Sequence, residues 1–469
     1  MFREMWVVVC LLVVSFCGLG YAGEIAVIST TDYSSGNLAV LAEGASEAQV
    51  DVLPICSDNA LFSYAGDLYV LERFGADNII KVDGNDLSPS GVVYQYSVGN
   101  GANPHGIAFV SDQKAYVTRY ADTKLWIINP SAASEAAFRI GEIDLSEYAD
   151  ADGFPEMSAM VLVDGKLYVG LQRLDQNTVF WDPLDAKVLV IDTATDVVIK
   201  AIDLEKGNPQ AMAAFGGKLY VTCGGNLSDP TDGSIEVIDI ETNTHAGVLT
   251  LESDLGGNVG ALVLRSANKG YVIVGGYLQD AKGNWMPSYV VRPFDPSDGT
   301  IEAALIGSQS ATSMELGGNG VLYVADRSTN WPGIYTYDAD DILVSSNPIA
   351  TGLPPSSIAF VGESGAVAVE ESVQQTPLAF ALGANYPNPF NAATVIPYTV
   401  EHAGDVRLSV YDELGRYVAT LVQDVQIAGR YVAQWNGRSE AGAAVASGFY
   451  LVRLETARQI ATSKVLFLK

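Results

Sequence analysis

Short apolar segments that contain a Tyr-Val step recur along most of this chain at nearly constant spacing. Successive tyrosines of these segments are 47, 52, 52, 51 and 52 residues apart: Tyr69, Tyr116, Tyr168, Tyr220, Tyr271 and Tyr323. A repeat of about 40–50 residues that is built from short strands is typical of a β-propeller, in which each repeat forms one blade. The pattern therefore predicts an all-β fold and says little about a ligand.

One repeat shows how apolar and polar positions divide into strands. Apolar segments over 104–110, 114–118, 124–129 and 137–143 are separated by short polar or proline-containing turns. We interpret them as the inner, second, third and outer strands of one blade. The same order recurs in the two repeats that follow.

The two ends of the repeat region predict how the propeller closes. Residues 25–29, 37–41 and 49–53 form three apolar segments without an inner partner, and residues 355–361 resemble an inner strand without outer ones. Pairing these segments leaves no exposed sheet edge. We therefore predict seven blades over residues 24–370, with six or eight as the range of error.

The residues that recur in each repeat also resemble those of a known family. Tyr-Val-Thr steps, and third strands that end in Val-Ile-Asp, resemble the YVTN-type propeller repeats of exported bacterial proteins. The resemblance spans about 340 residues. Because it exists only at the level of the repeat, it implies the fold far more firmly than any activity.

Residues 1–22 are interpreted as a signal peptide. Arg3 supplies the positive charge, Val7 to Gly20 is apolar and uncharged, and Ala22 lies at the expected cleavage position. Its removal leaves the cysteines Cys56 and Cys223, which we expect to be separate thiols. No later apolar segment is long enough for a membrane-spanning helix, so none is expected after cleavage.

The C-terminal residues 378–469, after a linker over 371–377, carry several motifs in order. Asn-Tyr-Pro-Asn-Pro-Phe-Asn begins at Asn385, and strand-like spacing surrounds the turn Asp412-Glu-Leu-Gly415. Trp435 precedes Asn-Gly, which is a hairpin turn signal beside an aromatic core residue. These residues predict a small β-sandwich.

These motifs resemble the type A C-terminal sorting domain of the type IX secretion system, which has an immunoglobulin-like fold. The alternative is an immunoglobulin-like module without a role in transport. The resemblance implies export through the periplasm of a bacterium with an outer membrane, a secreted or cell-surface location, and the type IX machinery as a partner. The matching residues are Asn385, Pro387, Asn388, Pro389, Gly415, Trp435, Gly448, Lys464 and Lys469.

Charge is distributed unevenly along the chain. The formal net charge is −29; residues 378–469 contribute eight Lys/Arg and seven Asp/Glu, so the preceding 18 Lys/Arg and 48 Asp/Glu give −30. Such a field disfavours nucleic acids and anionic membranes as partners. The simplest explanation of this excess of acidic residues is solubility. The alternative is that some of them bind calcium, with Asp150 and Asp152 as weak candidate ligands. No other cofactor is expected.

Repeat-equivalent positions suggest where a ligand could bind. Arginines follow four second strands, and His105 and Gln210 begin inner strands after matching Asn-Pro steps. Guanidinium groups suit anions, and indole faces suit sugars or cations. Alternatively the arginines form structural ion pairs and the tryptophans pack their loops. The arginines and tryptophans are Arg73, Arg119, Arg173, Arg327, Trp181, Trp285 and Trp331.

Motifs for nucleophilic catalysis, phosphate binding and haem attachment are not found in the sequence. His105 and Glu156 could act as an acid–base pair in a propeller enzyme, but this signal is weak. We therefore expect a monomeric binding module for a small anionic ligand, a glycan or a protein. The alternative is an exported hydrolase or lyase, with or without calcium.

Overall fold

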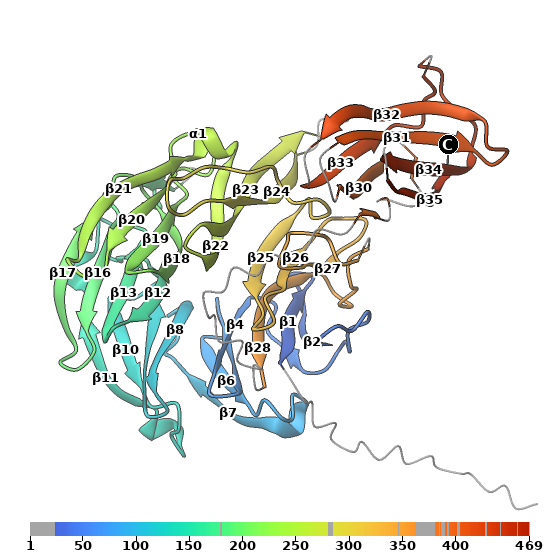
Figure 1. Cartoon of the computed structure of the whole chain (residues 1–469). Coiled ribbons are helices and arrows are strands. Elements are labelled where there is room, and N and C mark those ends of the chain that lie inside the picture. The colour runs from blue at the N-terminus through green and yellow to red at the C-terminus, as the bar shows by residue number, and fades with distance from the viewer. Residues whose placement is uncertain are drawn as a thin grey trace, which may run out of the picture. The chain divides into compact units, whose positions relative to one another are not determined.

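The computed structural model describes residues 24–178, 181–279, 285–345, 347–362, 380–383, 385, 390–391, 394–400, 404–426, 429–440, 442–456 and 458–468 (Figure 1). It divides into two compact units, residues 1–212 with 357–365 and residues 213–356 with 366–469. Both consist almost entirely of antiparallel sheets.

The first unit contains four four-stranded sheets, which we call blades 1 to 4. Blade 1 is β28 (Pro355–Val361), β1 (Ile25–Thr31), β2 (Gly36–Ala42) and β3 (Pro54–Ile55). Blade 2 is β4 (Asn59–Tyr64), β5 (Asp67–Glu72), β6 (Asn78–Val82) and β7 (Val92–Ser97). Blade 3 is β8 (Pro104–Ser111), β9 (Lys114–Arg119), β10 (Lys124–Ile128) and β11 (Arg139–Asp144). Blade 4 is β12 (Met157–Val163), β13 (Lys166–Leu171), β16 (Lys187–Asp192) and β17 (Val197–Asp203).

Three blades belong mainly to the second unit, although β18 begins in the first. Blade 5 is β18 (Pro209–Phe215), β19 (Lys218–Cys223), β20 (Ser234–Asp239) and β21 (Thr244–Leu251). Blade 6 is β22 (Asn258–Ser266), β23 (Lys269–Gln279) and β24 (Trp285–Phe294). Blade 7 is β25 (Ala311–Leu316), β26 (Leu322–Asp326) and β27 (Gly333–Tyr337).

Seven sheets of three or four strands, counted over the described residues up to 362, make this part of the chain a seven-bladed β-propeller. The predicted closure is confirmed, because β28 from the end of the repeats completes the sheet that β1, β2 and β3 begin. The outer strand of blade 1 differs from the prediction over 49–53. Asp51 has a φ of +56°, which interrupts the strand, and β3 forms only after it.

The repeated tyrosines are buried and link neighbouring blades. Tyr116 donates from its hydroxyl group to Asp196 in the turn between β16 and β17. Tyr271 donates to Asp341 at 2.5 Å, and Tyr220 donates to the carbonyl oxygen of Pro296 at 3.1 Å. Each of these three tyrosines thus packs its ring in the core and satisfies its hydroxyl group on the next blade, which favours tyrosine at this position of the repeat.

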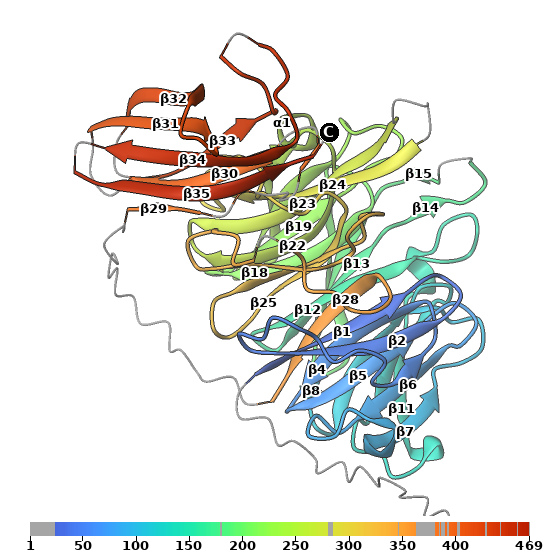
Figure 2. The same ribbon diagram turned by 90° about the vertical axis from the view of Figure 1, so that its right-hand side faces the viewer.

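The C-terminal part of the second unit is a β-sandwich of two sheets. One has the order β29 (Ala381–Leu382), β30 (Thr394–Val400) and β33 (Gly429–Trp435). The other has the order β32 (Tyr417–Gln426), β31 (Gly404–Asp412), β34 (Gly448–Thr456) and β35 (Ile460–Phe467), and Figure 2 shows these strands side by side. The signal segment 1–22, the linker 371–377 and the boundary near 378 lie outside the described residues.

The helices of the described residues are single turns: η1 (Pro89–Gly91), η2 (Glu135–Ala137), η3 (Ser146–Tyr148) and α1 (Glu252–Leu255). None of them is long enough to span a membrane. A two-stranded sheet of β14 (Leu174–Asp175) and β15 (Asp182–Pro183) extends from the loop between β13 and β16, as Figure 2 shows.

Candidate functional site

Three carboxylates gather in the first unit where the chain enters blade 4. Asp150 and Asp152 lie in the loop after η3, and Glu156 immediately precedes β12. One side-chain oxygen from each lies within 4.8 Å of the others. The sequence suggested Asp150 and Asp152 as weak candidate calcium ligands and Glu156 as one member of a weak acid–base pair with His105, so the structure brings residues from two separate predictions into one cluster.

Glu156 is the most constrained member of the cluster. Its side chain is fully buried, and its φ of +45° is unusual for a residue other than glycine. Gln176 donates to its carboxylate at 3.2 Å, and the backbone N–H of Leu174 lies 3.4 Å from the other oxygen. Burial, together with the negative charges of Asp152 and Asp150, raises the pKa of Glu156 to about 8.

The two aspartates use one oxygen each to shape their loop. Asp150 Oδ1 accepts from the backbone N–H of Asp152 at 3.1 Å, and Asp152 Oδ1 accepts from that of Phe154 at 2.9 Å. Both Oδ2 atoms are buried and have no hydrogen-bond partner. Burial raises the pKa of Asp150, and the charge of Arg173 partly opposes this.

His105 and Tyr120 lie near the acidic cluster. Their rings stack with centroids 4.2 Å apart. Burial, and secondarily the positive charge of Arg73, lowers the pKa of His105 to about 3, so the imidazole is neutral at physiological pH. Burial raises the pKa of Tyr120, and so do the charges of Glu156, Asp152 and Asp150. His105 is therefore a neutral group beside the carboxylates and not their counter-ion.

Two of the four arginines proposed from the sequence have partners close to their own blades. Arg73 donates to Asp58 through Nε at 2.8 Å and Nη2 at 2.5 Å. Arg119 is buried, donates to the carbonyl oxygen of Val98 at 2.8 Å, and pairs with Asp122 at 2.7 Å. Its guanidinium carbon lies 4.4 Å from the ring centroid of Trp126. These are the contacts of structural ion pairs, and a ligand-binding role for either arginine stays a prediction.

The other two arginines contact backbone carbonyl groups. Arg173 has a φ of +48° and donates through Nη1 to the carbonyl oxygen of Asp185 at 2.8 Å. Arg327, in the second unit, donates to the carbonyl oxygens of Pro354 at 3.1 Å and Pro355 at 3.2 Å. Of the four, the structure brings Arg73 near His105 and Arg173 near Asp150.

The two Asn-Pro steps place His105 and Gln210 equivalently, as the sequence suggested. Asn103 and Asn208 both have positive φ, at +48° and +61°, and the following prolines begin β8 and β18. Asparagine tolerates this conformation better than most residues. His105 and Gln210 are therefore the second residues of their inner strands, and both are half-buried.

Exposed aromatic side chains mark the loops between second and third strands. Trp181 is 48% exposed and Trp331 is 64% exposed, as expected of rim residues. Tyr33 in blade 1 and Phe74 in blade 2 are both 79% exposed at equivalent loops. The side chain of Trp285 lies outside the described residues.

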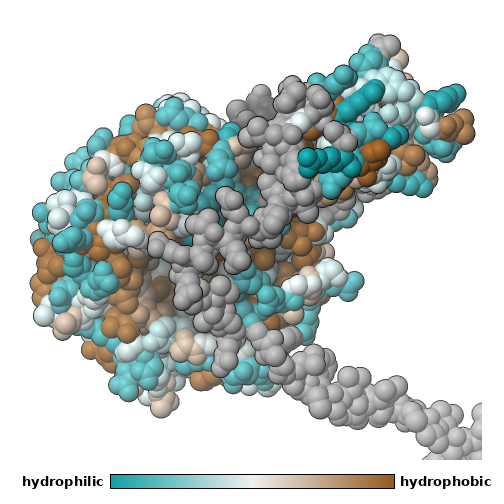
Figure 3. Space-filling model, viewed as in Figure 1, coloured by the Kyte–Doolittle hydropathy of each residue, from teal (hydrophilic) through white to brown (hydrophobic). Residues whose placement is uncertain are grey.

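Leu227 in blade 5, which is 62% exposed, extends the series, so among the described residues large apolar side chains are exposed at this loop in five of the seven blades. Tyr277 in blade 6 is also 62% exposed, but it lies on the second strand β23 itself. On the face that Figure 3 shows, hydrophobic and hydrophilic residues are interspersed outside the grey atoms. The significance of the series therefore lies in its repetition and not in one broad apolar area.

Several predicted residues of the C-terminal motifs have structural roles. Trp435 is 1% exposed in the sandwich core, and Gly415 has a φ of +78° in the turn between β31 and β32. Asn385 is buried and donates to Thr394 Oγ1 at 2.8 Å, and Lys464 Nζ lies 3.7 Å from the ring centroid of Phe449. Gly448 begins β34. Pro387, Asn388, Pro389 and Lys469 lie outside the described residues.

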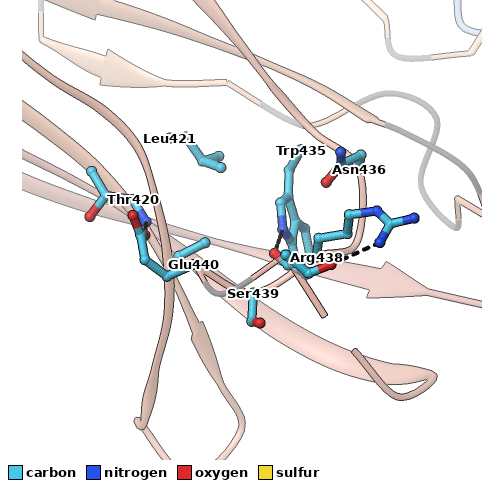
Figure 4. A pocket seen from close by; sticks show the side chains of 9 residues that line it. Thr420, Leu421, Trp435, Asn436, Arg438, Ser439 and Glu440 are labelled. Atoms are coloured by element: carbon cyan, nitrogen blue, oxygen red, sulfur yellow. Dashed lines mark hydrogen bonds between the residues drawn. The ribbon is translucent and has the colours of Figure 1, made fainter. Parts of the chain in front are cut away.

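A shallow pocket of about 320 Å³ lies in the sandwich (Figure 4). Trp435 donates to the carbonyl oxygen of Arg438 at 2.9 Å, and Glu440 accepts from the backbone N–H of Thr420 at 2.9 Å. Glu440 also accepts from Tyr417 at 2.6 Å. These polar groups thus form hydrogen bonds within the sandwich. The pocket has no cluster of carboxylates like the one before β12 among its lining residues.

Comparison with known proteins supports the architecture. Residues 391–459 match the model of the FlgD Ig-like domain family. A protein from Lactobacillus plantarum is similar over 73% of this chain and 100% of its own, with 13% identity and a TM-score of 0.52. No curated protein matches the sequence.

Two further solved structures are described as candidate 6-phosphogluconolactonases. The one from Bacteroides uniformis has 12% identity and a TM-score of 0.50 over 72% of this chain and 99% of its own. The one from Bacteroides fragilis has 13% identity and a TM-score of 0.50 over 72% and 98%. Identities this low show the fold alone. The chain thus joins a β-propeller to an immunoglobulin-like domain.

Proposed function

We propose that this protein is an exported propeller that binds carbohydrate through the loops between the second and third strands of its blades. The observation that carries the proposal is the recurrence of exposed aromatic rings at that loop. In the first unit these are Tyr33, Phe74 and Trp181. Single exposed apolar residues are ordinary, but the same exposure at the equivalent loop of three of the four blades of this unit supports a binding role.

Aromatic rings suit a sugar because they present a flat apolar face to its C–H groups, while polar neighbours bind its hydroxyl groups. Asp182 is adjacent to Trp181, and Asp32 is adjacent to Tyr33. A neutral glycan is favoured over an anionic ligand for two reasons. Arg73 and Arg119 already have carboxylate partners, and the region before residue 378 has a net charge of −30.

Export is the second part of the proposal. It is supported by the signal-peptide pattern over 1–22 and by the resemblance of residues 378–469 to a type A sorting domain of the type IX secretion system. The match of residues 391–459 to an Ig-like family is consistent with that fold. The protein would then be a monomer, secreted or held at the outer cell surface, with the type IX machinery as its transport partner.

A panel of immobilised polysaccharides, probed with the purified protein, tests the binding proposal. The glycan that binds is then titrated by calorimetry into the wild type and the variants Tyr33→Ala, Phe74→Ala and Trp181→Ala. Since burial of an exposed aromatic ring contributes about 1–3 kcal/mol, each variant should weaken binding about 5-fold to 150-fold.

Control variants come from the outer strands, where large apolar side chains are also exposed. Ile140 on β11 is 54% exposed and Ile199 on β17 is 49% exposed. Ile140→Ala and Ile199→Ala should leave the affinity unchanged. Equal losses in both groups of variants, or no binding to any polysaccharide, would reject the carbohydrate proposal.

One observation favours a second function, that of an exported hydrolase or lyase. Glu156 has a raised pKa of about 8 beside Asp150 and Asp152, and a buried carboxyl group of this kind can act as a general acid. If so, the glycan that binds should also be cleaved, and Glu156→Gln should abolish cleavage while binding persists. Absence of cleavage products in the wild type would leave binding as the function.

A further inference from the structure

We propose that Asp150, Asp152 and Glu156 bind one calcium ion in the first unit. Their side-chain oxygens lie within 4.8 Å of one another. Calcium–oxygen bonds are about 2.3–2.6 Å long, so two ligands on opposite sides of one ion are about 5 Å apart. The three oxygens can therefore share one coordination sphere without any movement of the chain.

The buried oxygens of the two aspartates are a second reason, besides the clustering of acidic residues, to expect a bound ion. The Oδ1 atom of each holds a backbone N–H in its own loop, whereas the Oδ2 atom of each is buried and has no partner. A buried charged oxygen without a partner is costly. Glu156, whose side chain is 0% exposed, closes the cluster from the side of β12.

Other buried carboxylates of this protein accept hydrogen bonds from nearby donors. Glu252 accepts from the backbone N–H groups of Gly233 at 2.9 Å and Val259 at 2.7 Å. Asp326 accepts from Ser308 Oγ at 2.7 Å and from two backbone N–H groups at 2.8 Å. The Oδ2 atoms of Asp150 and Asp152 have no such donors. A bound cation would supply the missing interaction for both.

The charges of the site match a divalent cation. Around a bound cation the three carboxyl groups would all be ionised and carry −3, and Arg173, whose charge acts on Asp150, contributes +1, which leaves −2. The donors are all oxygen atoms, which calcium prefers, whereas zinc prefers nitrogen and sulfur. Backbone carbonyls and water would complete the six to eight ligands that calcium takes. The ion would fix the entry loop of blade 4 near Tyr120 and His105.

Calorimetry of the full-length protein, freed of metal with a chelator, tests the proposal with calcium chloride as the titrant. We expect one ion per chain, with a dissociation constant of about 10⁻⁴ M or below, in the range of calcium sites of extracellular modules or tighter. Saturating calcium should also raise the thermal unfolding midpoint by several degrees. No binding heat and no shift of the midpoint at millimolar calcium would overturn the proposal, as would a shift with magnesium or manganese alone.

The variant D150N/D152N separates a calcium site from a merely structural cluster. Asparagine Oδ1 can still accept the two loop hydrogen bonds, so the variant should fold and, without calcium, be at least as stable as the wild type. Calcium affinity should fall ~10-fold or more. The control Asp298→Asn changes an exposed turn carboxylate that accepts from the N–H of Thr300, and should bind calcium like the wild type. Unchanged affinity in D150N/D152N would contradict the assignment.

Discussion

Residue by residue, the acidic side chains of this propeller serve different purposes. Glu72, which is buried at the end of β5, accepts from the backbone N–H of Cys56 at 2.6 Å and from Asn78 Nδ2 at 2.9 Å, so it fixes a loop. Glu252 and Asp326 have the same kind of role. Asp150 and Asp152 differ from them, because the buried Oδ2 atom of each is left without a donor beside the buried carboxylate of Glu156.

His105 gives a prediction that is independent of any ligand. Burial lowers its pKa from 6.5 to about 3, so its ring should stay neutral from pH 8 to pH 4. The ring resonances of only three histidines need to be resolved by NMR, and the variant His105→Gln identifies the signal. A His105 signal that titrates near pH 6.5 would show that the ring is solvated.

The same shift has a consequence for stability. Because the folded protein binds the proton less readily than the unfolded chain, stability from neutral His105 is fully present above pH 6.5 and is lost as the pH falls towards 3. Compared with His105→Gln, the wild type should therefore lose stability in urea over this range. A constant difference between the two proteins would contradict this expectation.

The environment of a single residue could be predicted from the sequence only where that residue type strongly prefers one environment. Trp435 was predicted as a core residue because it is an aromatic residue beside an Asn-Gly turn signal, and it is buried. The arginines could not be assigned, since their partners Asp58 and Val98 lie in loops whose path the sequence does not define. Tyr120, Phe74 and Tyr33 were missed, although Phe74 and Tyr33 occupy the same loop as Trp181.

Among the elements, the second strand of each blade carries most of the information. In blades 2 to 7 a buried tyrosine lies on this strand, so its spacing reports the blade period, and in blades 3, 5 and 6 its hydroxyl group bonds to the next blade. The spacing predicted six blades, and the unpaired apolar segments at the two ends of the repeats predicted the seventh and its closure by β28. It could not predict β3, because the break at Asp51 depends on a positive φ that the sequence does not signal strongly.

The link between blades can be tested by removing single hydroxyl groups. Tyr116→Phe removes a hydrogen bond to the carboxylate of Asp196 and should cost about 1.5–3 kcal/mol of unfolding free energy. Tyr220→Phe removes a bond to the neutral carbonyl oxygen of Pro296 and should cost about 0.5–1.5 kcal/mol. Denaturation in urea measures both, and equal or negligible losses would show that the hydroxyl groups are not what keeps tyrosine at these positions.

For the whole molecule, the chain combines a propeller scaffold with a C-terminal Ig-like domain that has its own core. If residues 378–469 are the export signal, their deletion should leave the propeller folded in the periplasm, because blade 1 is completed by β28 before that segment begins. Fractionation of cells that express the full and the shortened protein measures this. Release of the shortened protein to the medium at the normal level would contradict the sorting role.

The loops between second and third strands are proposed to bind a glycan. A crystal structure of the full protein with the polysaccharide fragment selected by the binding panel tests it most directly. We predict a sugar ring stacked on Tyr33, Phe74 or Trp181 in the first unit, with hydrogen bonds to neighbouring loop residues. A fragment bound on the outer strands or in the sandwich pocket beside Trp435, with these three rings exposed to solvent, would contradict the claim.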